Sequence, residues 1–137
     1  MTLPPKKTIL VVEDTALVLT TVRMILEHAN FTVLAAASAD EAVELSGHAK
    51  SIDLLLSDVM MPGISGPDLA LKLKESRPEM RVILMSGYPD GAMLVLNYGW
   101  QFIAKPFVNN MALVEKVKGI LSSTTKSQGT DHFDTEK

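Results

Sequence analysis

The chain has 137 residues, about the size of one domain and enough to bury a core. Its net charge is −3, with 13 basic and 16 acidic residues, which argues against a general positive field for binding nucleic acid. Cysteine is absent, which excludes disulfides, thiolate catalysis and cysteine-bound zinc. The apolar part of the N-terminus is too short for a signal peptide, and no stretch approaches the roughly 20 apolar residues that span a bilayer. We therefore expect a cytoplasmic protein that binds neither nucleic acid nor a membrane.

Short apolar runs alternate with stretches of helical periodicity along the chain. The runs predict strands at residues 8–12, 31–35, 52–56, 82–85 and 100–104. The first, third and fourth runs are nearly continuous in Val, Ile and Leu, which is typical of strands buried on both faces of a parallel sheet.

Helices are predicted between these strands. The first covers residues 16–28, and a capping box that opens with Ser38 starts the second. Ser65 can cap the third, residues 89–97 form a weaker fourth, and Asn109 or Asn110 can cap a fifth that ends near Leu121. This (βα)5 order predicts a doubly wound, flavodoxin-like α/β fold with strand order 2-1-3-4-5. Residues 1–7 are expected to be an extension, 8–121 the domain, and 122–137 a disordered polar tail.

Chemically useful side chains follow four of the five runs. Glu13 and Asp14 end the first, Asp58 the third, Ser86 the fourth and Lys105 the fifth. The carboxyl ends of parallel strands share one edge of a sheet, and ligands bind there at the switch point of strand order. We therefore expect these five residues to lie around one site.

Three closely packed carboxylates repel one another, so they should hold either protons or a cation. Oxygen ligands without His or Cys favour a hard cation, and an open site with few carboxylates suits Mg²⁺. Lys105 adds a positive charge and Ser86 a hydroxyl. A phosphoryl group bonded to a carboxylate would satisfy every member of the set, and Asp58 on the central strand is the natural nucleophile.

Four motifs carry a resemblance to a known family: VVED, LLLSDVMMPGISG, MSGY and KPF. In this order and at compatible spacings they resemble the receiver domains of response regulators in two-component signalling. The resemblance covers roughly residues 7–121, and the wording around the central aspartate is similar to the receivers of hybrid sensor kinases. It implies a chemotaxis-regulator-like receiver, either stand-alone or excised from a hybrid kinase.

The resemblance also assigns a phosphorylation and metal site. Asp58 would accept the phosphoryl group from a histidine kinase or a histidine phosphotransfer protein. Asp14 and Asp58 would bind Mg²⁺ directly, Glu13 would bind it through water, and the backbone carbonyl of Met60 would complete the protein ligands. Lys105 would pair with the phosphoryl oxygens.

The resemblance also implies roles in switching and in the lifetime of the phosphorylated state. The Lys105–Pro106 bond is expected to be cis and to aim the lysine. Ser86 is the switch hydroxyl and Phe102 the switch aromatic, and a phenylalanine cannot donate a hydrogen bond, so switching should rest on packing. The output would be the face of helix 4, strand 5 and helix 5, read by an unknown downstream protein. Neither Met60 nor Tyr88, the residues expected to flank the phosphoryl group, carries an acid or amide to orient water, which predicts slow self-dephosphorylation.

Other functions stay open at this stage. A haloacid-dehalogenase-like phosphatase also places an aspartate nucleophile and Mg²⁺ at a strand end, but it needs a second acid two residues later, where this chain has Met60. No separate enzymatic turnover is therefore expected. A receiver that binds its partner without phosphorylation is the other alternative. Taken singly, Asp58 could also be a turn residue before Pro62 and Gly63.

Overall fold

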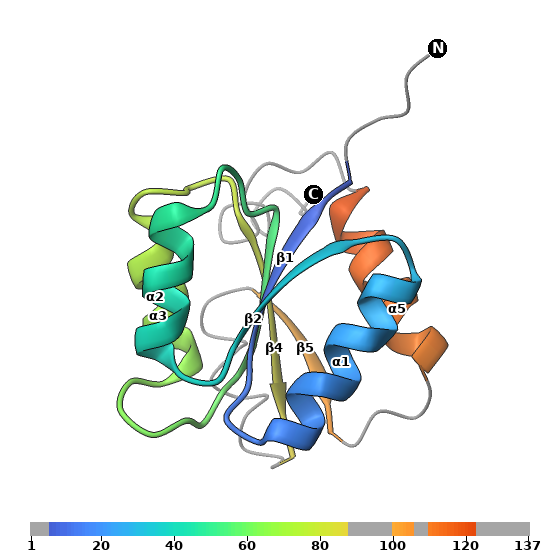
Figure 1. The fold of residues 1–137 in the computed structure, drawn as a ribbon, viewed down its shortest axis with the longest axis horizontal. Coiled ribbons are helices and arrows are strands. Elements are labelled where there is room, and N and C mark those ends of the chain that lie inside the picture. The colour runs from blue at the N-terminus through green and yellow to red at the C-terminus, as the bar shows by residue number, and fades with distance from the viewer. Residues whose placement is uncertain (1–5, 88–99, 106–109, 123–137) are drawn as a thin grey trace, which may run out of the picture.

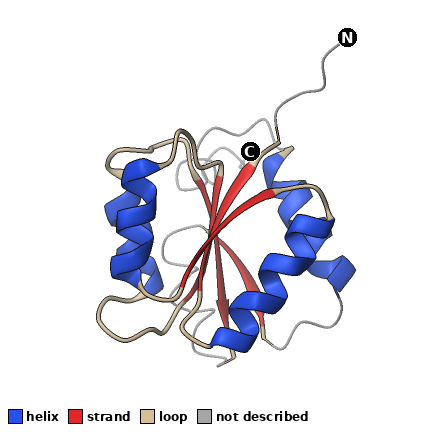
Figure 2. Cartoon of the chain, in the orientation of Figure 1, coloured by secondary structure: helices blue, strands red, loops and turns tan. Residues whose placement is uncertain are grey.

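We analysed a computed structural model, which describes residues 6–87, 100–105 and 110–122. A central sheet is flanked by helices on both sides (Figures 1 and 2). In chain order the elements are β1 (Thr8–Val12), α1 (Ala16–His28), β2 (Thr32–Ala36), α2 (Ala39–His48), β3 (Leu54–Asp58), α3 (Gly66–Lys74), β4 (Arg81–Ser86), β5 (Gln101–Ala104) and α5 (Asn110–Leu121). The predicted helix at residues 89–97 lies outside the described residues.

The five strands are parallel and stand in the order β2-β1-β3-β4-β5. This confirms the predicted doubly wound fold. The central strand is shifted by two residues from its predicted place at 52–56. The shift arises because an apolar run in the sequence indicates which residues are buried and does not indicate which residues pair in a sheet. Ile52 is buried although it precedes the strand, whereas the polar Ser57 and Asp58 pair with β4. Asp58 is therefore the last residue of β3 instead of lying two residues beyond it.

Smaller boundary errors affect three other strands. β2 begins one residue later than predicted, β5 also begins one residue later, and β4 is longer by one residue at each end. Phe31 and Trp100, the residues left out, are both buried, so they belong to the core without belonging to the ladder.

Two apolar layers enclose the sheet. On one face, alternate strand residues such as Leu10, Leu55 and Leu84 pack with α2 and α3. On the other face, Ile9, Leu56 and similar residues pack with α1 and α5. Figure 1 shows the two helix pairs on opposite sides of the sheet. Because β3 is buried along its whole length, its last residue lies in closely packed surroundings.

The helix starts follow the predicted capping chemistry. Ser38 Oγ accepts the amide N–H of Glu41 at 3.1 Å, and Glu41 Oε1 accepts the amide N–H of Ala37 at 2.8 Å. Ser65 Oγ accepts the amide N–H of Asp68 at 3.2 Å. Asn109 lies outside the described residues. Within the part of the chain that is described, no helix is long and apolar enough to cross a membrane.

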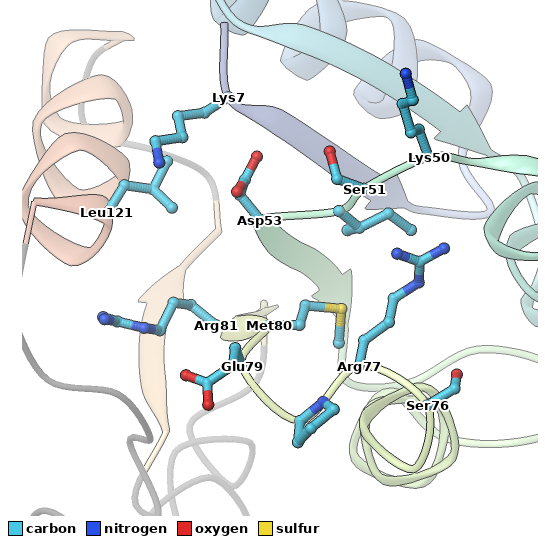
Figure 3. A pocket seen from close by; sticks show the side chains of 12 residues that line it. Lys7, Lys50, Ser51, Asp53, Ser76, Arg77, Glu79, Met80, Arg81 and Leu121 are labelled. Atoms are coloured by element: carbon cyan, nitrogen blue, oxygen red, sulfur yellow. The ribbon is translucent and has the colours of Figure 1, made fainter. Parts of the chain in front are cut away.

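The amino-terminal edge of the sheet carries a pocket of about 420 Å³ (Figure 3). Residues at strand starts, including Asp53 and Arg81, line it together with Arg77. Two of these side chains make hydrogen bonds to backbone groups of the fold. Asp53 Oδ2 accepts the amide N–H of Thr8 at 2.8 Å, and Arg77 donates to the carbonyl of Ser46 at 2.7 Å. The residues predicted to form the functional site lie at the opposite ends of the strands.

Candidate functional site

The carboxyl ends of β1, β3, β4 and β5 bring the predicted residues to one edge of the sheet. Glu13 directly follows β1, Asp58 ends β3, Ser86 ends β4 and Lys105 directly follows β5. The amide of Lys105 donates to the carbonyl of Ser86 at 2.8 Å, which continues the pairing of β4 and β5 up to the lysine. The pairing of the strands thus places these four residues at the same edge of the sheet.

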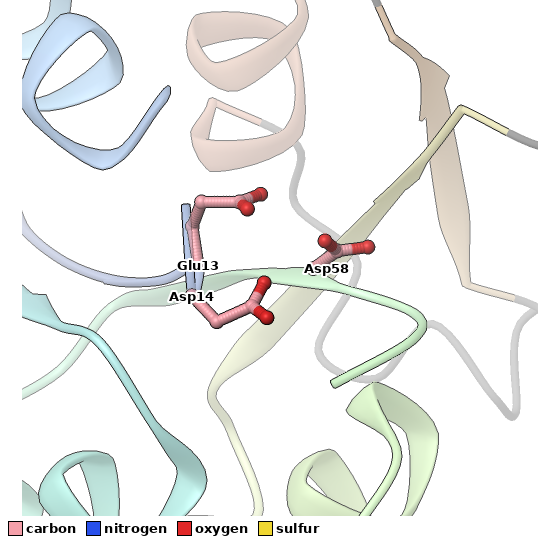
Figure 4. Close-up of side chains that lie close together, drawn as sticks. All are labelled: Glu13, Asp14 and Asp58. Carbon is pink, nitrogen blue, oxygen red and sulfur yellow. The ribbon is translucent and has the colours of Figure 1, made fainter. Parts of the chain in front are cut away.

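Three carboxylates meet at this edge (Figure 4). Glu13, Asp14 and Asp58 each place an oxygen within 4.8 Å of the others, although they come from two strands. Glu13 is fully buried and Asp58 is 7% exposed, whereas Asp14 is exposed. The cluster is therefore closed toward the core and open to solvent on the side of Asp14.

Lys105 bridges the two buried carboxylates. Its Nζ donates to Glu13 Oε1 at 2.9 Å and to Asp58 Oδ2 at 3.1 Å. The remaining oxygens are also engaged: Glu13 Oε2 accepts the amide N–H of Thr15 at 3.0 Å, and Asp58 Oδ1 accepts that of Met60 at 3.3 Å. Such charge-assisted bonds hold both carboxylates in fixed orientations.

The two buried acids respond oppositely to this setting. Burial raises the pKa of Asp58, the hydrogen bond from Lys105 opposes it, and the charge of Glu13 raises it further, so the pKa of Asp58 lies above its ordinary value. Burial also acts to raise the pKa of Glu13, but hydrogen bonds from Lys105 and Thr15 outweigh it, and that pKa lies below its ordinary value. Burial lowers the pKa of Lys105, yet its bonds to both acids raise it overall. Asp58 is thus the acid whose charge is less well compensated.

The donor set fits a divalent cation. Three carboxylates against one ammonium group leave an excess of two negative charges when all are ionised. All three acids offer oxygen, which suits a hard cation such as Mg²⁺, and the exposed Asp14 leaves an open side for water or a second ligand. The residues present therefore match a magnesium site in charge and in ligand type.

Gly66, the first residue of α3, positions the Asp58 backbone. A Cβ at Gly66 would overlap the carbonyl oxygen of Asp58. The amide of Gly66 also donates to the carbonyl of Val59 at 2.9 Å, and the amide of Val59 donates to that of Met85 at 2.9 Å. The glycine thus closes the loop after Asp58 against the strand end. The signal in the sequence was the glycine that directly follows the capping Ser65.

The other predicted site residues have mixed outcomes. Met60 lies on the loop beside Asp58 and is exposed. Ser86 is buried at the same edge. Phe102 is half-buried and packs against the apolar layer beneath α2 and α3, in register with Leu84. Tyr88 and Pro106 lie outside the described residues.

Fold and site together define a class: a doubly wound α/β domain with an acidic, lysine-bridged site at the carboxyl edge of its sheet. The family model of the response regulator receiver domain matches residues 9–118. The chain belongs to the response regulator receiver domain family of two-component signalling.

Several relatives are similar to this chain. The sensor kinase CckA of Brucella abortus (strain 2308) is 35% identical over an alignment of 104 residues that covers 73% of this chain and 11% of that protein. The transcriptional regulatory protein ResD of Bacillus subtilis (strain 168) is 30% identical over 87% of this chain and 50% of that protein. The chain thus spans half or less of the length of these curated relatives.

Solved structures show the same fold. A CheY-like receiver domain from Methanospirillum hungatei JF-1 matches with a TM-score of 0.76 and 33% identity, covering 85% of this chain and 94% of that one. The receiver domain of the hybrid histidine kinase CckA matches with a TM-score of 0.71 and 36% identity, covering 84% and 99%. Receiver domains of this family bind Mg²⁺ at an acidic pocket and are phosphorylated by histidine kinases or phosphotransfer proteins.

Proposed function

We propose that this chain is a phospho-accepting signalling switch in which Asp58 takes a phosphoryl group from a histidine kinase or a histidine phosphotransfer protein. The observation that carries the proposal is the Lys105 bridge, with Nζ at 3.1 Å from Asp58 Oδ2 and 2.9 Å from Glu13 Oε1. It supports a role for Asp58 because a lysine already bonded to the acceptor carboxylate is in reach of the phosphoryl oxygens that the acceptor would gain.

The metal ligands in this proposal are Asp14 and Asp58 directly, the backbone carbonyl of Met60, and Glu13 through water. The support is the meeting of three carboxylate oxygens within 4.8 Å beside an exposed Asp14. Bound there, Mg²⁺ would supply positive charge to the phosphoryl oxygens during transfer. The Lys105–Pro106 bond, proposed to be cis, would keep the lysine aimed at the same group.

The transfer itself needs a nucleophile and a leaving group. A carboxylate oxygen of Asp58 attacks the phosphorus of a phosphohistidine, the P–N bond breaks, and the imidazole nitrogen keeps the electron pair and takes up a proton. The bonds from Lys105 and from the Met60 amide fix the carboxylate before the attack, so little orientational entropy is lost at that moment. The pKa of Asp58 is raised because burial disfavours its ionised form. Positive charge from a bound cation would favour that ionised form, which is the nucleophile.

Phosphorylation must then change a surface. We place the change at Ser86, whose hydroxyl would bond the phosphoryl group, and at Phe102, which packs against the apolar layer and can respond only by repacking. The output face would consist of residues 89–97, β5 and α5, contacted by a downstream protein. Met60 and Tyr88 supply no group to activate water, so the phosphorylated state would hydrolyse slowly and no separate substrate would be turned over.

The wider assignment is proposed on the same basis. Residues 8–121 would form the receiver domain, 1–7 an extension and 122–137 a polar tail, in a cytoplasmic setting without contacts to nucleic acid or membrane. The support is the family match at residues 9–118 and the net charge of −3.

Intact-mass analysis tests the proposal. The purified chain with Mg²⁺ and a small phosphodonor such as acetyl phosphate should gain the mass of one phosphoryl group. Chelating the metal or introducing Asp58→Asn should prevent the gain. An unmodified mass with Mg²⁺ present would contradict the proposed function, as would uptake that persists in Asp58→Asn.

A further inference from the structure

Met60 is an exposed residue whose backbone amide makes a hydrogen bond to the proposed phosphoacceptor. Its amide donates to Asp58 Oδ1 at 3.3 Å, so the side chain begins only two bonds from the nitrogen that contacts that carboxylate. Met60 is 60% exposed, although Asp58 itself is buried. A large apolar side chain left in solvent at this place is not explained by core packing.

We propose that Met60 is an oxidation site through which peroxide-class oxidants shorten the lifetime of the phosphorylated state. This inference rests on the proposed function of Asp58. Hydrogen peroxide transfers one oxygen atom to the Met60 sulfur: the O–O bond breaks, an S–O bond forms, the sulfur is oxidised by two electrons and the peroxide is reduced to water. Exposure makes the reaction accessible, and methionine sulfoxide reductases are the class of enzyme that would reverse it.

The chemical effect follows from hydrogen bonding. A thioether sulfur is a weak acceptor and cannot hold a water molecule firmly against phosphorus. A sulfoxide carries a strongly polar oxygen on the same flexible side chain. The buried side of the site is already filled by Glu13 and Lys105, so an attacking water must enter from solvent, to which both Asp14 and Met60 are exposed. Oxidation therefore adds a water-binding group on the path of attack.

The expected size is modest. A sulfoxide orients water but does not remove its proton, so the gain should stay well below the roughly 100-fold that a general base supplies, at about three- to tenfold in hydrolysis rate. Because oxidation leaves the Met60 backbone unchanged, the hydrogen bond from its amide to Asp58 and its carbonyl group are still present afterwards.

Met24 provides a matched control. It is 61% exposed, nearly the same as Met60, but it lies in α1 away from the acidic cluster. The full chain would be treated with hydrogen peroxide, sulfoxide would be located by peptide mass spectrometry, and the oxidised and untreated samples would be loaded with acetyl phosphate and Mg²⁺. After the donor is removed, intact mass follows the loss of the phosphoryl group.

Three results are expected: oxidation of Met60 raises the hydrolysis rate about three- to tenfold, Met24→Leu keeps this response, and Met60→Leu loses it. Met60→Gln, which carries an amide oxygen at a similar reach, should speed hydrolysis without oxidant.

An unchanged hydrolysis rate in protein with oxidised Met60 would overturn the inference while leaving phosphorylation of Asp58 intact. So would a response that persists in Met60→Leu. Failure of the untreated chain to take up phosphate would instead remove the proposed function, and this inference with it.

Discussion

At the scale of single residues, the chemistry depends on a lysine shared by two buried acids. The hydrogen bond from Lys105, together with one from the Thr15 amide, stabilises the negative charge of Glu13 enough to lower its pKa. The bond from Lys105 to Asp58 does not offset burial, so the pKa of Asp58 stays raised. The metal-free protein thus keeps one acid in an unfavourable setting. That cost is the physical reason why a cation, and then a cation with a phosphoryl group, should bind there.

The first prediction follows from this cost and concerns stability. Because the folded pKa of Asp58 is raised, its ionised form opposes folding, and the metal-free Asp58→Asn variant should be more stable than the unmodified protein at neutral pH. We expect a gain on the order of 1 kcal/mol, the size of a typical single substitution. Urea unfolding at several pH values in the presence of a chelator measures it.

The pH dependence of this gain in stability follows from the upward direction of the Asp58 pKa shift. The gain is fully present above the raised pKa of Asp58 and shrinks as the pH falls through that pKa. It disappears below the ordinary value of 3.8, where the carboxyl is protonated in both states. Equal stability of the two proteins at neutral pH would show that Asp58 carries no such cost.

At the scale of elements, the start of α3 fixes where the Asp58 backbone lies. Gly66 contacts the Asp58 carbonyl so closely that no Cβ fits, although alanine is the better helix former. The clash is with backbone and cannot be relieved by a side-chain rotation. Steric exclusion should therefore outweigh helix propensity at this position.

The second prediction is that Gly66→Ala destabilises the fold by about 1–3 kcal/mol, as overpacking does, and slows phosphorylation by moving the strand end. Gly119→Ala is the control: Gly119 is also helical, in α5, and a Cβ there meets nothing within 4 Å. That change should be neutral or stabilising by up to about 1 kcal/mol. Thermal unfolding and the rate of phosphoryl uptake separate the two. A Gly66→Ala protein as stable and as reactive as the Gly119→Ala protein would contradict the role given to Gly66.

At the scale of the whole molecule, the alternation of apolar runs and helical stretches was sufficient to predict a doubly wound parallel sheet and the edge at which the site residues gather. The order 2-1-3-4-5 was taken from the flavodoxin-like form of that fold, and the structure has it. Strand boundaries were less accurate, because buried residues such as Ile52 and Trp100 flank the ladder without pairing in it. The sequence placed Glu13, Asp14, Asp58 and Lys105 at one edge. It gave no sign that Lys105 would divide its bonds between two acids, because that depends on three-dimensional distances.

The most direct test of the central claim is to locate the phosphoryl group. Acyl phosphates are reduced by borohydride, so the phosphorylated chain can be reduced and the converted residue identified by peptide mass spectrometry. We expect conversion at Asp58 and none at Glu13, Asp14 or Asp53. Conversion at any of those three acids with Asp58 intact would contradict the account.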